Sequence, residues 1–207
     1  MKICMISDTH SLHEELTLPE ADLLIHAGDI SSRGEVGELE RFLAWFSALP
    51  HPHKVFIGGN HDFFLEESRE AFLRMVPDNL VYLENEQREV AGIKIWGSPI
   101  TPYFFNFAFN RHRGRAIRCY WEEIPADTDI VVTHGPPFGV GDATVKGVRA
   151  GCDDLLDIVT KIKPRYHIFG HIHEAYGIYE KEDTTFVNAS VLDIHYRTVH
   201  PPIVLDW

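Results

Sequence analysis

Five short segments of the chain combine aspartate, asparagine or histidine with small residues, and such side chains bind metal ions. The candidate ligands in these segments are Asp8, His10, Asp29, Asn60, His134, His171 and His173. Their mixture of carboxylate, imidazole and one amide suits Mn²⁺, Fe²⁺ or Fe³⁺, or Zn²⁺, whereas Ca²⁺ prefers oxygen-only cages. Seven ligands are too many for one tetrahedral ion. They predict two metal ions that share a bridging carboxylate, as in two-metal hydrolases.

Each of these segments directly follows a short apolar run that is typical of a buried strand. The runs cover residues 3–6, 23–25, 55–57, 130–132 and 167–169. Ligands in α/β proteins gather at the carboxyl ends of strands, so we expect these side chains to converge. Any one of the histidines alone is as easily a satisfied core or surface residue. Five of the 13 histidines fall in the strand-end segments, however, and chance explains that set poorly.

Further apolar runs and helical stripes set the fold class. The additional strand-like runs cover residues 93–96, 178–179, 186–187 and 203–205. Helical spacing of apolar residues occurs at residues 36–49, 72–76, 117–121 and 152–162, and the last stripe is stopped by Pro164. Early alternation of strands and helices, followed by a strand-rich final third, predicts an α/β sandwich. No linker-like stretch interrupts residues 1–207, which we expect to form a single domain.

The composition of the chain limits the classes of partner that we expect. A formal net charge of −12 repels phosphate backbones, so we expect no binding to duplex nucleic acid. No uncharged run is long enough to span a membrane, and we expect no membrane partner. Three cysteines, an odd and sparse set, favour reduced thiols in a cytoplasmic protein. The aromatic stretch 103–109 has three open interpretations: a nucleobase stack, the face of a homodimer, or core packing. The oligomeric state stays open.

The ordered set of segments resembles the calcineurin-like metallophosphoesterase superfamily. The matching motifs are Asp8-Thr9-His10, Gly28-Asp29, Gly59-Asn60-His61-Asp62, His134-Gly135 and Gly170-His171-Ile172-His173. Residues 97–102, 109–114, 133–137, 170–177 and 187–190 more narrowly resemble the branch of small metallophosphoesterase-domain proteins. Some animal members of that branch replace the first histidine of the last motif and lose much activity, whereas this chain keeps His171.

This resemblance implies a fold and a role for each motif residue. The implied fold is a four-layer α/β/β/α sandwich with two mixed β-sheets. Asp29 would bridge two ions, and His61 would face the substrate phosphate. One ion would be held by Asp8, His10 and His173, and the other by Asn60, His134 and His171.

The expected function is dinuclear metal-dependent phosphoester hydrolysis. Two divalent ions outweigh the charges of Asp8 and Asp29, so the site would attract a phosphate anion. A hydroxide between the ions would attack phosphorus, and His61 would protonate the leaving oxygen as a general acid. We expect a phosphodiesterase acting on small diesters or cyclic nucleotides. A phosphomonoesterase and a low-activity nucleotide-binding or scaffold protein remain as alternatives.

Several residues near the motifs have less definite roles. Asp62, counted with His61 among the catalytic residues, either orients His61 or caps the following helix. We expect His13 and His26 to support the site rather than to bind metal. Asn188 resembles a supporting residue. Arg113 either contacts substrate or is a solvated surface arginine.

Overall fold

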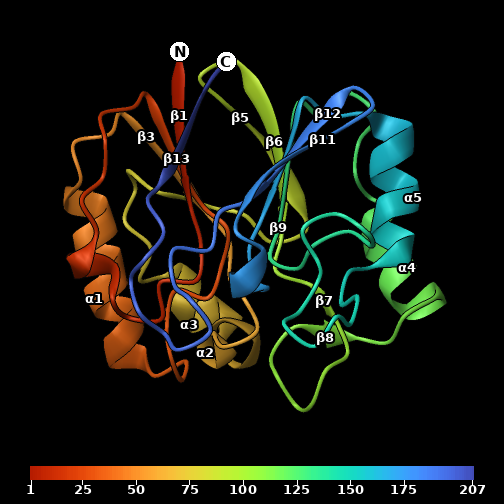
Figure 1. Ribbon diagram of the computed structural model, residues 1–207. Helices are drawn as coiled ribbons and strands as arrows, with labels where there is room; N and C mark the ends of the chain where they lie inside the picture. Colours follow the sequence, from red (N-terminus) through yellow and green to blue (C-terminus); the bar gives the residue numbers. More distant parts are fainter.

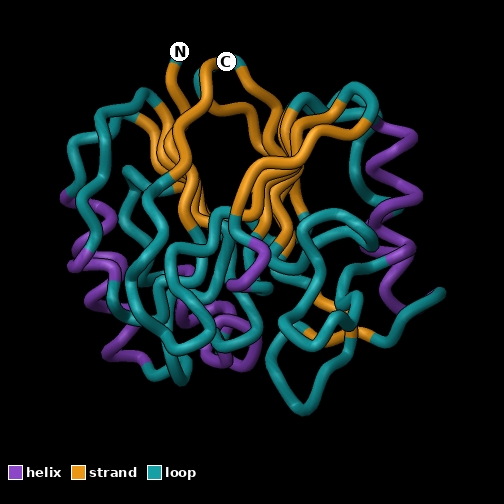
Figure 2. The backbone as a smooth tube through the Cα atoms, viewed as in Figure 1, coloured by secondary structure: helices purple, strands orange, loops and turns teal.

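The computed structural model describes residues 1–207. Two β-sheets face each other at the centre of the molecule, and helices lie on their outer sides (Figure 1; Figure 2). The first sheet has the strand order β13-β1-β2-β3-β4, and the second has the order β11-β12-β10-β9-β6-β5. Each sheet is mixed: β1 runs parallel to β2 and antiparallel to β13, and β5 runs antiparallel to β6. The expected four-layer sandwich with two mixed sheets is confirmed.

The elements have the following bounds. The first sheet contains β1 (Lys2–Ile6), β2 (Leu23–His26), β3 (His53–Phe56), β4 (Val81–Tyr82) and β13 (Ile203–Asp206). The second contains β5 (Glu86–Val90), β6 (Ile93–Ser98), β9 (Ile130–Thr133), β10 (Tyr166–Phe169), β11 (Gly177–Lys181) and β12 (Thr184–Asn188). A short pair is formed by β7 (Thr101–Pro102) and β8 (Asn110–Arg111). The α-helices are α1 (Val36–Ala48), α2 (Phe63–Glu67), α3 (Arg69–Leu73), α4 (Arg115–Trp121) and α5 (Asp153–Ile162).

The central strands are buried on both faces, which explains their continuous apolar sequences. In β1, Ile3 and Met5 belong to an apolar cluster built from residues of both sheets. Cys4 and Ile6 belong to a second cluster, which includes Phe42 of the covering helix α1. Because successive residues of a strand point to opposite faces, a strand between two apolar layers needs an apolar residue at nearly every position.

The strand directions bring the candidate ligands to one end of the molecule. Strands β1, β2 and β3 are parallel in the first sheet, and β9 and β10 are parallel in the second. Their carboxyl ends all lie at the lower end in Figure 1. Just beyond those ends the two sheets meet, where Ser7 after β1 forms a bridge with Ser190 after β12. The loops from both sheets therefore share one space.

All nine predicted strands are found, and four more appear. Strand β5 has the sequence Glu-Gln-Arg-Glu-Val and lies at the edge of its sheet, where charged residues are common and no apolar run is needed. The predicted second helix is displaced, since α3 ends at Leu73 and Met75 lies in the turn that follows. None of the helices combines the length and apolar character that crossing a bilayer requires.

Candidate metal centre

All seven candidate ligands come together at the carboxyl ends of the two sheets. They follow β1, β2, β3, β9 and β10, and the set is Asp8, His10, Asp29, Asn60, His134, His171 and His173. All but His171 are at most 9% exposed. Charged and polar groups are rarely buried in this way unless they are paired or bind metal.

The backbone has positive φ angles at four of these seven positions. Asp8, His10, Asp29 and His171 have φ values of 56°, 41°, 53° and 68°. Residues other than glycine seldom adopt this left-handed region, and each such residue costs on the order of 1–3 kcal/mol. Strain of this kind persists where the surrounding structure enforces it, and it clusters at functional sites.

One group of ligands forms around Asp8. The ligand atoms of Asp8, His10 and His173 lie within 4.8 Å of one another. His173 Nε2 is 3.5 Å from Asp8 Oδ1, while its Nδ1 donates to the Asp193 carbonyl over 3.0 Å. Ser190 donates its hydroxyl proton to Asp8 Oδ2 over 2.7 Å. The ring of His173 is therefore oriented by a carbonyl on one nitrogen, which leaves the other nitrogen for a metal.

A second group forms around His134. The ligand atoms of Asp29, His134 and His171 lie within 4.8 Å of one another. His134 donates from Nδ1 to the Ala27 carbonyl over 3.0 Å, so Nε2 faces the site, 2.9 Å from Asn60 Oδ1. The carbonyl again fixes which nitrogen is available for a metal.

Asp29 lies between the two groups. Its Oδ2 atom is 3.5 Å from His10 Nε2 and 3.3 Å from His134 Nε2. Its Oδ1 atom accepts the backbone N–H of His61 over 2.8 Å. Its Oδ2 atom thus faces an imidazole nitrogen from each group, so the geometry agrees with a bridging carboxylate.

The charges of this cluster favour bound cations. Burial opposes ionisation of Asp8, yet the His173 hydrogen bond holds the pKa of Asp8 well below its usual range. Burial lowers the pKa of His134 and His173, but the charges of Asp29 and Asp8 outweigh it and raise each pKa to about 9. Burial also lowers the pKa of His10 and His171 to about 4. Neither ring nitrogen of His10 has a hydrogen-bond partner despite being buried. Two divalent ions would satisfy these groups, so the donor set fits a dinuclear centre.

His61 lies beside the cluster. Its Nδ1 atom donates to the Ser32 carbonyl over 2.9 Å, which leaves Nε2 without that partner. The ring packs edge-on against His10, with centroids 4.8 Å apart. A ligand atom of His61 also lies within 4.8 Å of those of His10 and Asp29, so metal ligation remains an alternative to test.

Asp62 has neither of the two predicted roles. Its carboxylate is fully buried and makes no hydrogen bond to the His61 ring or to the amino end of α2. It accepts the backbone N–H groups of Ile30, Ser31 and Gly59 instead, together with the Ser31 hydroxyl. Burial and the nearby Asp29 charge raise its pKa to about 6. Asp62 therefore ties together the loops that carry Asp29 and Asn60, and a direct part in catalysis stays a prediction.

Other residues near the motifs take supporting positions. His26 donates from Nε2 to the Thr9 hydroxyl and accepts the Gly28 N–H on Nδ1, outside the cluster. His13 packs against Phe42 and Trp45.

The side chains of Asn188 and Arg113 also donate hydrogen bonds to backbone carbonyls. Asn188 donates to the carbonyls of Gly141 and Ile172, which braces the loop of the final motif. Arg113 donates to the carbonyls of Ala150 and Gly151 and does not line the site.

Sequence reasoning missed three residues. Ser190 follows β12 and contacts Asp8, so the same strand-end rule, applied to one more strand, would have found it. Asp193 acts through its backbone carbonyl, which no side-chain pattern reveals. Tyr196 lines the site from an irregular turn and carries no sequence signal.

A pocket of about 190 Å³ opens onto this centre. Five of the seven candidate ligands and His61 line it, and Phe104, Phe107 and Tyr196 form the rest of its wall. No lysine or arginine lines the pocket. Any large positive charge in it would therefore come from bound metal ions.

Known proteins match this chain over most of its length. The calcineurin-like phosphoesterase family matches residues 1–175. A human protein named metallophosphoesterase domain-containing protein 1 is 39% identical, covering 97% of this chain and 69% of its own length. A UPF0046 protein of Caenorhabditis elegans is 37% identical, covering 100% of this chain and 80% of its own.

Solved structures share the fold. One is 17% identical with a TM-score of 0.68, covering 99% of this chain and 98% of its own. Another, described as GAP50, the anchor in the inner membrane complex of Plasmodium, is 11% identical with a TM-score of 0.53. It covers 92% of this chain and 71% of its own. The family match, the human relative and the convergent ligands agree: this chain belongs to the calcineurin-like phosphoesterases, within the branch of metallophosphoesterase-domain proteins, and is a metal-dependent phosphoesterase.

Proposed function

We propose that the protein is a phosphodiesterase that hydrolyses small diesters, cyclic nucleotides among them, at a dinuclear metal centre. The observation that carries this proposal is the position of Asp29, whose carboxylate reaches both ligand groups. Asp8, His10 and His173 would hold one ion, and Asn60, His134 and His171 the other. Mn²⁺, iron and Zn²⁺ all suit this ligand set.

When bound, the two ions supply the positive charge that draws a phosphate and the Lewis acidity that activates water. His61 would act on the leaving oxygen, on the side of phosphorus opposite the attacking water. Because Nδ1 is held by the Ser32 carbonyl, a protonated His61 ring carries its second proton on Nε2, where it is free to be donated. Positioned acids of this kind accelerate reactions by about 10²–10⁴-fold.

Two bound ions by themselves would attract a monoester dianion more strongly than a diester, so the expected diester preference depends on the rest of the pocket lining. A monoester dianion carries two charges, and proteins commonly meet the additional charge with arginine or lysine. Neither residue type lines this pocket, so His61 is the side chain left to meet phosphate charge beside the ions. A diester carries a single negative charge and needs no further cation.

Turnover by the Mn²⁺-reconstituted protein tests the proposal. The substrates are bis-p-nitrophenyl phosphate, p-nitrophenyl phosphate and a nucleoside cyclic phosphate. We expect a higher kcat/KM for the bis ester than for the monoester. A higher value for the monoester would identify a phosphomonoesterase, and no turnover of any ester would identify a binding or scaffold protein. Asp29→Asn, prepared in parallel, controls for contaminating phosphatases.

A further inference from the structure

The pocket has aromatic walls at both ends. We propose that Tyr196 on one side, and Phe104 with Phe107 on the other, each hold one organic group of the diester. Among phosphodiesters, the site would then favour those that carry a flat aryl or heteroaryl group on both sides of phosphorus, whereas a cyclic nucleotide, with one such group, would use a single wall. This inference rests on the proposed phosphodiesterase function and names the side chains that set its substrate class.

Four rings form a row across the site. Tyr196 packs against His10 with centroids 4.9 Å apart, His10 lies 4.8 Å from His61, and His61 lies 4.9 Å from Phe107. Phe104 is nearly parallel to Phe107, with an interplanar angle of 7°. His10 and His61 are thus in the middle of the row, and the rings of Tyr196 and Phe107 are at its two ends.

The turn that presents Tyr196 is tied to a candidate metal ligand. Asp193 Oδ1 accepts the backbone N–H groups of His195 and Arg197, over 2.9 and 3.0 Å. Tyr196 has a left-handed φ of 57°, and its N–H donates to the Asp193 carbonyl. The same carbonyl accepts the Nδ1 proton of His173. One turn therefore sets the position of His173 and of the Tyr196 ring together.

The opposite wall is tied to a ligand in the same manner. The Asn110 side-chain amide donates to the carbonyls of Phe104 and Phe105, over 2.9 and 3.2 Å, and closes the aromatic loop. Ala108 N–H donates to the Asn60 carbonyl over 3.0 Å. Each wall is thus built into the framework of the metal centre, which favours a role in the site over loose surface packing.

The wall rings are left uncovered by the protein itself. Phe104 is 55% exposed and Tyr196 is 51% exposed, although both line the pocket. Exposed aromatic groups that gather around a cleft mark a binding surface, and planar rings stack favourably on them. A monoester has one organic group and can use only one wall, whereas a diester can use both.

Wall variants tested on three nitrophenyl esters separate this inference from a general structural effect. Bis-p-nitrophenyl phosphate has two aryl groups, methyl p-nitrophenyl phosphate has one, and p-nitrophenyl phosphate is a monoester. We expect Tyr196→Ala and Phe104→Ala each to lower kcat/KM for the bis ester roughly tenfold, mainly through KM. For the methyl ester only one of the two variants should matter. Tyr196→Phe keeps the ring and should restore activity.

Matched controls come from the same two loops. Phe105 is 70% exposed and Ile194 is 44% exposed, and neither lines the pocket. Ile194→Ala should stay within about twofold of the wild type. Phe105 packs against Phe104 with centroids 4.4 Å apart, so Phe105→Ala should lower activity on the bis ester less than Phe104→Ala does. Equal losses on all three esters, or no loss in either wall variant, would overturn the inference while leaving the phosphodiesterase intact. Absence of turnover by the wild-type protein would instead refute the proposed function, and this inference with it.

Discussion

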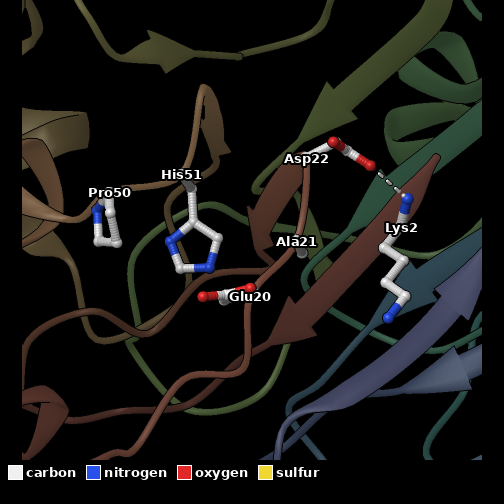
Figure 3. A pocket seen from close by; sticks show the side chains of 6 residues that line it. All are labelled: Lys2, Glu20, Ala21, Asp22, Pro50 and His51. Carbon is white, nitrogen blue, oxygen red and sulfur yellow. Dashed lines mark hydrogen bonds between the residues drawn. The ribbon is translucent and has the colours of Figure 1, made fainter.

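Two hollows lie at opposite ends of the first sheet, and the smaller of the two contains the buried candidate ligands. The hollow at the amino ends of the strands is about 400 Å³ in volume and is bordered by Lys2, Asp22 and His51 (Figure 3). The hollow at the carboxyl ends is about 190 Å³ in volume and opens onto the candidate metal centre. A third hollow of about 590 Å³, bordered by Arg69, Leu73 and Tyr82, is larger than either, so volume does not indicate the functional site.

The two hollows differ in how their polar groups are satisfied. At the amino ends, Asp22 accepts the backbone N–H of Lys2 (Figure 3). His51 donates from Nε2 to the Pro19 carbonyl, and only its Nδ1 atom is left without a partner. At the carboxyl ends, buried carboxylates face buried imidazoles, and His10 has no partner on either ring nitrogen. Buried, converging and strained groups mark a functional site, because a stable fold without a ligand has no reason to keep them.

Among substitutions at the two ends of the sheet, replacement of the bridging carboxylate of Asp29 should have the largest effect on metal content and activity. Asp29→Ala should abolish binding of both ions, since it removes the bridge and exposes the two cations to their mutual repulsion. Activity should fall by more than the roughly 10–100-fold that loss of a supporting residue costs. Elemental analysis and turnover of bis-p-nitrophenyl phosphate measure the two effects. A variant that keeps both ions and most activity would show that Asp29 does not bridge.

Substitution of His61 tests catalysis separately from metal binding. His61→Ala should retain its metal ions and lose about 10²–10⁴-fold in kcat on a nucleoside cyclic phosphate, whose alkoxide needs a proton as it leaves. The loss on bis-p-nitrophenyl phosphate should be much smaller, because nitrophenolate leaves without one. Equal losses with metals retained would make His61 an electrostatic contact to the phosphate, and loss of metal would make it a ligand.

Metal affinity at the carboxyl ends should depend steeply on pH. In the metal-free protein the pKa values of His134 and His173 are raised to about 9, so both rings are protonated at pH 7. A ligating imidazole must be neutral, so each ion displaces one of these protons, and each unit fall in pH should weaken the binding of each ion up to about tenfold. Above about pH 9 the dependence should vanish. Calorimetry in buffers of different ionisation enthalpy counts the protons, and a count of zero at pH 7 would contradict these pKa values.

A substitution in the amino-end hollow should have the smallest effect on stability and activity. Asp22→Asn keeps the shape of the side chain and removes a charge that lies far from the ligands. Stability should change within about 0.5 kcal/mol, and metal content and turnover should not change. A large loss of activity in this variant would show that the amino-end hollow also takes part in function.

The sequence revealed most of the fold and the ligand set because both follow from local rules. Strands such as β1 are apolar throughout since both faces are buried, and Asp8 and His10 directly follow that strand. Glycines mark close approaches that only a bare backbone permits: a Cβ atom on Gly59 or Gly170 would collide with the carboxylate of Asp29 or Asp8.

What the sequence could not reveal depends on contacts between distant segments. The role of Asp62 is decided by backbone N–H groups about 30 residues away, and no local pattern distinguishes it from a catalytic carboxylate. Tyr196 reaches the pocket because the Asp193 turn folds back on His173. Strand β5 owes its place to pairing with β6 rather than to its own apolar content.

The number of metal ions per chain tests the central claim most directly. Wild-type protein, reconstituted with Mn²⁺ and freed of excess metal, should hold close to two ions by elemental analysis. Asp8→Ala should lose the ion of one ligand group, and His171→Ala should lose the ion of the other. Saturation at a single ion, with metal content unchanged in His171→Ala and Asn60→Ala, would contradict the dinuclear centre.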